Sequence, residues 1–139
     1  MTAETQLKTA QKTKSLEDRI DAIEHIDRVN TTYIPIRAEV EASNTTPDPD
    51  ADDYDMYILT ALAGNATFSA PSGTPSQGQK LLIRIKDNGT IRTLGWNAIY
   101  RAMGVDLPTT TTASKTMYVG FVYNSTDTKW DCVAFVEQE

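Results

Sequence analysis

The sequence predicts a mainly β protein: a small antiparallel β-sandwich or barrel-like domain preceded by a short N-terminal helix. Two patterns predict this class. After residue 54, apolar and polar residues alternate with a period of two in short runs, and Gly, Asn, Asp and Pro separate the runs. Before it, residues 16–29 carry apolar residues at helical spacing. With 139 residues, 40% of them apolar, the chain accommodates one ordinary domain and an appendage.

Composition divides the chain into four segments. We expect a flexible N-terminal arm over residues 1–14, a helix for oligomerisation or attachment over 15–30, an extended connector and acidic linker over 31–53, and a β-domain over 54–139. Residues 33–41 of the connector could also form a short strand, which Pro35 restricts to a sheet edge or a strand start. The arm is polar, with Leu7 as its one aliphatic side chain after Met1, so it cannot bury enough surface to fold alone. The linker is rich in Pro, Asp, Thr and Asn, which favour turns and solvent.

The helix begins at Ser15, with Asp18 three residues later as a weak form of the capping box. Its apolar stripe consists of Leu16, Ile20, Ile23, Ile26 and Val29. A helix of roughly four turns is marginal in water by itself, so this stripe must be covered. Two arrangements remain open: a short symmetric coiled coil made with other copies of the chain, and packing on the β-domain. We assign the stripe to oligomerisation.

The β-domain is expected to contain short strands at 56–62, 66–70, 80–86, 91–96, 115–123 and 129–136. Residues 97–105 could form either a helical turn or a strand. Asn65 and Gly89 suit turns, and the Asn88-Gly89 pair predicts a hairpin between the runs 80–86 and 91–96. Trp96 and Trp130 are predicted core anchors. In the last strand Trp130, Cys132, Ala134 and Val136 should share one face, and apolar residues on both sides of the last two strands predict an interface between copies.

The charge pattern excludes several classes of partner. The formal charge of −6 belongs to residues 1–53, whereas residues 54–139 contain seven Lys or Arg and seven Asp or Glu. An acidic chain without a basic stripe argues against nucleic-acid binding and against docking on anionic membranes. No apolar run is long enough for membrane insertion. The single cysteine, Cys132, cannot form an internal disulfide, and no cofactor motif is present.

The sequence contains candidate residues for three kinds of site, each of which has a simpler structural explanation. Acids at 48, 50, 52, 53 and 55 imitate part of a calcium loop, but Asp53 stands where that loop needs glycine, so a solvated linker is favoured and no metal is assigned. A glycosidase needs two facing carboxylates, which the pattern does not supply, so no catalytic residue is assigned. Glycan binding would use exposed aromatic residues; the candidates are Trp96, Tyr100, Tyr118, Tyr123 and Trp130.

Residues 54–139 resemble a β-domain of structural proteins in tailed bacteriophages. The resemblance is carried by the stretches 62–67 (LAGNAT), 78–85 (GQKLLIRI), 92–96 with Tyr100-Arg101, 118–124 (YVGFVYN) and 129–134 (KWDCVA). It implies a non-enzymatic protein on the virion surface that needs no cofactor. It also implies a homotrimer acting as a capsid decoration protein or short head fibre, joined to other virion proteins through the N-terminal segment. The alternative is a tail-fibre module that binds a host-surface glycan.

Overall fold

The computed structural model describes residues 2–6, 16 and 35–139. It divides into two compact units, Met1–Pro35 and Ile36–Glu139. In the first unit, residues 3–6 form one helical turn where the sequence predicted a flexible arm. The hydroxyl of Thr2 begins this turn by accepting a hydrogen bond from the amide of Thr5 at 3.3 Å. The helix predicted over 15–30 lies outside the described residues, apart from Leu16.

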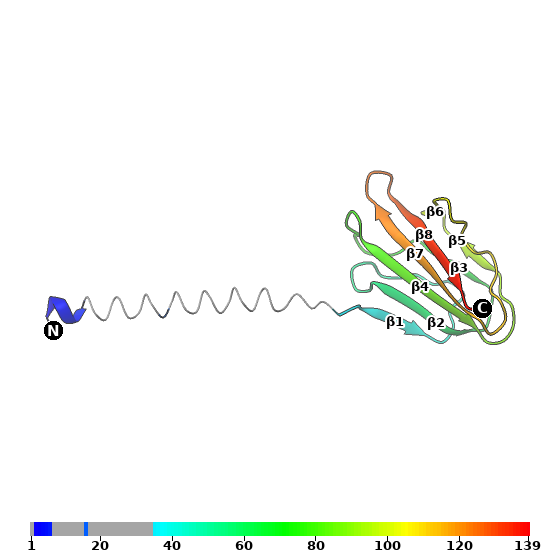
Figure 1. Cartoon of the computed structure of the whole chain (residues 1–139), viewed down its shortest axis with the longest axis horizontal. Helices are drawn as coiled ribbons and strands as arrows, with labels where there is room; N and C mark the ends of the chain where they lie inside the picture. Colours follow the sequence, from blue (N-terminus) through cyan, green and yellow to red (C-terminus); the bar gives the residue numbers. More distant parts are fainter. Residues whose placement is uncertain (1, 7–15, 17–34) are drawn as a thin grey trace. The chain divides into compact units, whose positions relative to one another are not determined.

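The second unit contains eight strands: β1 (Ala38–Glu41), β2 (Met56–Leu62), β3 (Ala66–Phe68), β4 (Lys80–Asp87), β5 (Leu94–Trp96), β6 (Tyr100–Ala102), β7 (Thr116–Asn124) and β8 (Lys129–Glu137). Six of them form one sheet in the order β1-β2-β4-β7-β8-β6, while β3 and β5 form a second, two-stranded sheet (Figure 1). The mainly β class is therefore confirmed. Residues 97–105, left open between a helical turn and a strand, contain β6.

The large sheet is mixed, whereas antiparallel pairing was expected. β1, β2 and β4 run parallel, β7 is antiparallel to both β4 and β8, and β6 is parallel to β8. Parallel neighbours need a crossover connection instead of a tight turn. The chain between β2 and β4 makes such a crossover, and it contains β3.

One face of the large sheet carries the core. The alternating residues of β4 and β7 on this face are at most 1% exposed: Leu81, Ile83, Ile85, Met117, Val119 and Phe121. The small sheet covers this face, because Phe68 of β3 is fully buried and Trp96 of β5 lies 5.7 Å from Phe121, centroid to centroid. The domain thus has the two layers of a β-sandwich.

The structure places the start of the β-domain at residue 36, not at residue 54. β1 lies within the segment predicted as connector and pairs with β2. The proline-rich segment that follows is also part of the domain, because Pro47, Pro49 and Ala51 are buried. The carbonyl of Pro47 accepts a hydrogen bond from the amide of Ser69 at 2.8 Å. Proline has no backbone N–H to donate, but its carbonyl can accept a hydrogen bond and its ring can pack. A segment with the composition of a linker therefore forms part of the fold.

The predicted hairpin at Asn88-Gly89 is wrong. Gly89 does have a positive φ of 97°, as such a turn requires. However, the chain after the turn does not return along β4, because β4 is already paired with β2 on one side and β7 on the other. Instead β5 pairs in parallel with β3. The local turn signal was correct, but the pairing was decided by contacts distant in sequence.

A β-bulge divides β8 into two halves. Gly120 pairs with Ala134 and Phe121 pairs with Cys132, so Val133 is the extra residue on the β8 side. An extra residue reverses the faces of everything that follows it. Ala134 and Val136, predicted to share the buried face with Trp130 and Cys132, are therefore exposed on the opposite face.

Candidate functional site

Only one of the predicted oligomerisation residues falls within the described part of the chain. Leu16 is helical and 49% exposed. The other four, Ile20, Ile23, Ile26 and Val29, lie outside the described residues. Their role in assembly stays a prediction.

The two predicted turn residues lie in connections. Asn65 lies between β2 and β3, where its side-chain oxygen accepts a hydrogen bond from the amide of Thr93 at 2.9 Å. Gly89 lies in the turn after β4. Asn65 therefore joins the connection between β2 and β3 to the segment that precedes β5.

The acidic residues between β1 and β2 make structural contacts. A carboxylate oxygen of Asp50 accepts a hydrogen bond from the amide of Asp52, and a carboxylate oxygen of Asp52 accepts one from the amide of Thr74. Asp55 forms an ion pair with Arg37 at 3.0 Å, and the Arg37 hydrogen bonds lower the pKa of the Asp55 carboxyl. Among the described residues, no group of three or more His, Cys, Asp or Glu is arranged to hold a metal ion.

An ion-pair cluster joins β6 to β8 and its preceding turn. Arg101 Nε lies 2.7 Å from Asp131 Oδ1, and Arg101 Nη2 lies 2.9 Å from Asp127 Oδ2. The hydrogen bonds from Arg101 outweigh partial burial and lower the pKa of the Asp131 carboxyl. Arg101 is the residue opposite Asp131 in the β6–β8 register.

Most of the aromatic candidates for glycan binding belong to the core. Tyr100, Tyr123 and Trp130 are 4%, 8% and 1% exposed. Trp96 is half-buried, and its ring stacks on Phe68 with 4.4 Å between centroids. Its indole N–H donates to a carbonyl oxygen in the connection after β6, at 2.7 Å. These four rings pack in the interior of the domain, and Tyr118 is the remaining candidate for glycan binding.

Tyr118 lies on the outer face of the large sheet, opposite the core. In the strand register it is the neighbour of Arg84, which in turn neighbours Ile58. A shallow depression of about 230 Å³ is lined here by Leu59, Thr60, Arg84, Lys86, Thr116 and Tyr118. It combines a phenol ring, two threonine hydroxyl groups and two cations.

The two cations of this depression are uncompensated. The ion pairs within residues 2–6, 16 and 35–139 involve Arg37 and Arg101, and none involves Arg84 or Lys86. Such a surface is suited to an anionic or hydroxyl-rich ligand, because the cations attract charge and the ring supplies a flat apolar face. Tyr118 was among the aromatic candidates predicted from the sequence, but Arg84 and Lys86 were not predicted as part of a site. The strand register brings these cations close to Tyr118, and the local sequence does not show it.

Cys132 is a core residue of β8. Its side chain is fully buried, and its Sγ donates a hydrogen bond to the carbonyl of Ala134 at 3.7 Å. Burial raises the pKa of the thiol, so the neutral form is favoured. These properties are typical of a structural cysteine.

The chain matches no family model, and no curated protein matches it. In the part that the structure describes, no helix has the length and apolar character needed to cross a membrane.

Proposed function

We propose that this chain is a non-enzymatic structural component of a tailed-phage virion. It acts as a trimeric capsid decoration protein or short head fibre on the particle surface, and its N-terminal segment anchors it to other virion proteins. The observation that carries this proposal is that, apart from the depression around Tyr118, the charged and aromatic side chains considered as site candidates make contacts within the β-domain. Arg37, Arg101 and Asp131 are engaged in ion pairs, and the aromatic rings of Tyr100 and Trp130 fill the core.

Two further features support this role. The chain forms two separate compact units, which suits a protein with one part that attaches and one part that projects. Residues 54–139 also resemble β-domains of tailed-phage structural proteins. Both features favour a structural component over an enzyme.

The proposal predicts that the chain is found in purified particles of the phage that encodes it. Mass spectrometry of the particles should detect its peptides, and gold-labelled antibody against the β-domain should decorate the head. Light scattering should give three times the 15.4 kDa mass of one chain. Purified particles that lack the chain would contradict the proposal. Gold label on the tails would mean that the protein belongs to the tail and not to the head.

A second function is supported by the depression around Tyr118. A half-buried ring beside two cations without an ion-pair partner among the described residues is suited to an acidic saccharide on a host surface. The open part of the ring stacks on a sugar face and the cations bind a carboxylate. In this case the β-domain would be the receptor-binding module of a tail fibre.

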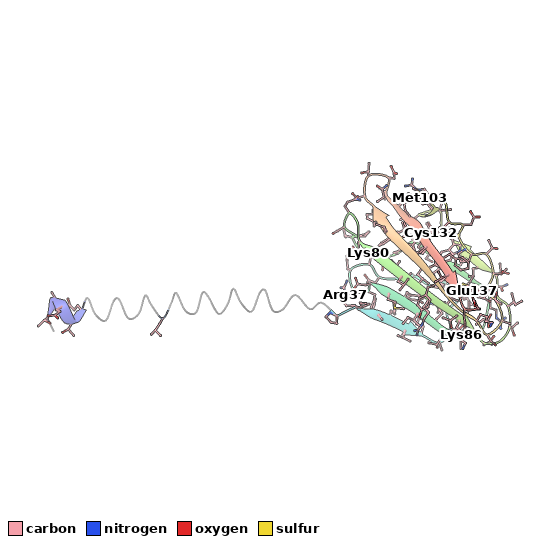
Figure 2. The ribbon with its side chains drawn as sticks, viewed as in Figure 1. Arg37, Lys80, Lys86, Met103, Cys132 and Glu137 are labelled. Atoms are coloured by element: carbon pink, nitrogen blue, oxygen red, sulfur yellow. The ribbon has the colours of Figure 1, made fainter. Side chains whose placement is uncertain are left out.

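We predict that acidic glycans bind this depression through Tyr118 and Lys86. Replacing either residue with alanine should weaken binding on a glycan array at least about tenfold, the effect of losing roughly 1.4 kcal/mol. Lys80→Ala is the matched control, since Lys80 lies on the same strand as Lys86, at its other end (Figure 2). An array without any bound saccharide, or equal losses for the Lys80 and Lys86 variants, would argue against this function.

A further inference from the structure

The C-terminal half of β8, residues 133–137, is exposed on both of its faces. Val133, Phe135 and Val136 are 53%, 37% and 59% exposed, although the first half of the same strand is buried. Apolar side chains on both faces of one exposed strand segment are unusual, because an exposed strand normally turns polar residues to solvent. Their clustering points to a surface that another molecule covers.

The backbone edge of this segment is also open. β6 pairs with β8 only from Trp130 to Cys132, so residues 133–137 have β7 on one side and no strand on the other. The amide of Gln138 donates to Thr116 of β7, at 2.9 Å. Bonded residues alternate along an antiparallel pair, so the amides and carbonyls of Phe135 and Glu137 point away from β7. Within the described residues these groups have no other backbone partner.

The opposite edge of the sheet is protected in ways that this one is not. β1 is four residues long, carries Glu39 and Glu41, and follows Pro35 closely. A short, charged edge strand preceded by proline discourages pairing with other chains. In the exposed half of β8 the single charged side chain is Glu137, which accepts a hydrogen bond from the hydroxyl of Thr112 at 2.9 Å.

A second copy of the same chain is the occupant that fits this surface. Glu137 is the one charged side chain of residues 133–137, so little charge on this surface opposes the approach of a second copy. An open strand edge offers amides and carbonyls that pair with another strand, and a second copy brings strands of the same kind. In a closed ring each copy presents the same residues to the axis. Three exposed apolar side chains per copy would then become nine in a trimer.

We propose that residues 133–137 of β8 form a contact surface between copies of this chain, with the open edge covered by the neighbouring copy. This inference rests on the homo-oligomer proposed above and gives it an interface within the β-domain. This interface is distinct from the one predicted for residues 16–29, which belong to another part of the chain.

The test compares the full-length chain with the double variant Val133→Lys and Val136→Lys. Both side chains already reach solvent, so the lysines should not unfold the domain. We expect the wild type to be an oligomer by light scattering and the variant to associate on the order of 100-fold more weakly. Val40→Lys is the matched control, because Val40 is as exposed as Val136, at 59%, but lies on β1 at the opposite edge of the sheet.

Amide hydrogen exchange gives a second readout. In the wild-type oligomer the amides of Phe135 and Glu137 should be protected, and in the double variant they should exchange quickly. An oligomer that the double variant leaves intact, or one in which these amides exchange quickly, would overturn this inference while the proposed homotrimer stands. Assembly would then depend on residues 16–29, which Ile20→Asp with Ile23→Asp would disrupt. A wild type that stays monomeric at all concentrations would overturn both.

Discussion

Replacing Phe68 with alanine is expected to lower the free energy of unfolding by about 3 to 5 kcal/mol. Phe68 is fully buried between the two sheets. Its ring stacks on Trp96 with an interplanar angle of 9°, and it meets Tyr57 edge-on with 6.4 Å between centroids. The variant loses the burial of the ring and both aromatic contacts, and it leaves a cavity that the short strand β3 cannot close. Urea unfolding at one fixed protein concentration measures the change.

Thr67→Ala is the control for this substitution. Thr67 is the neighbour of Phe68 on β3, and it is exposed. Its replacement should change the free energy of unfolding by no more than about 0.5 kcal/mol. If Phe68→Ala does not fold at all, Phe68→Leu keeps most of the apolar volume and should show a smaller loss of the same sign. A loss below about 1 kcal/mol for Phe68→Ala would mean that the small sheet does not close the core.

The strands that could be predicted from the sequence are those whose pattern is local. β4 and β7 alternate apolar and polar residues along their whole length, because one face of each lies on the core. β1 was not predicted as part of the domain, since it is a short edge strand with two glutamates. Pro47 and Pro49 were predicted to lie in a linker, because proline has no backbone N–H to donate. Composition does not reveal that their carbonyls can still accept hydrogen bonds and that their rings can still pack.

The features of the candidate sites were harder to predict, because they depend on register. The local pattern of β8 does not show that Val133 is the bulged residue. This one extra residue nevertheless places Val136 on the outer face of the sheet instead of the core face. The depression likewise exists because antiparallel pairing places Tyr118 of β7 beside Arg84 of β4, while parallel pairing brings β2, which carries Thr60, to the other side of β4. Such alignments follow from the order of strands in the sheet, which alternation does not specify.

Removing the carboxylate of Asp87 is expected to destabilise the β-domain by about 3 kcal/mol, because buried donors would lose their acceptor. Asp87 is 3% exposed at the end of β4. One of its oxygens accepts hydrogen bonds from the amides of Gly89 and Ser114, at 2.9 and 2.7 Å, and the other accepts one from the hydroxyl of Thr111 at 2.6 Å. Asp87 thereby joins the turn after β4 to the connection before β7. Asp87→Ala, with the exposed Asp106→Ala as control, tests this by thermal and urea unfolding.

The pH dependence of stability separates the charge of Asp87 from its shape. Burial disfavours the carboxylate, but the hydrogen bonds from Thr111, Ser114 and Gly89, helped by nearby Arg92, together outweigh burial and lower the pKa of Asp87. A lowered folded-state pKa means that the carboxylate stabilises the fold fully above the unfolded-state pKa of about 3.9, and that this contribution is lost as the pH falls through the folded-state value.

Asp87→Asn keeps the shape of the side chain but cannot ionise. The difference in unfolding free energy between wild type and Asp87→Asn should therefore be constant from about pH 6 to pH 8 and should shrink below about pH 4. Other aspartates with lowered pKa values, Asp55 and Asp131, titrate in both proteins and cancel in this difference. A difference that stays constant down to about pH 2 would mean that the hydrogen-bonding shape of Asp87, and not its charge, joins these two connections.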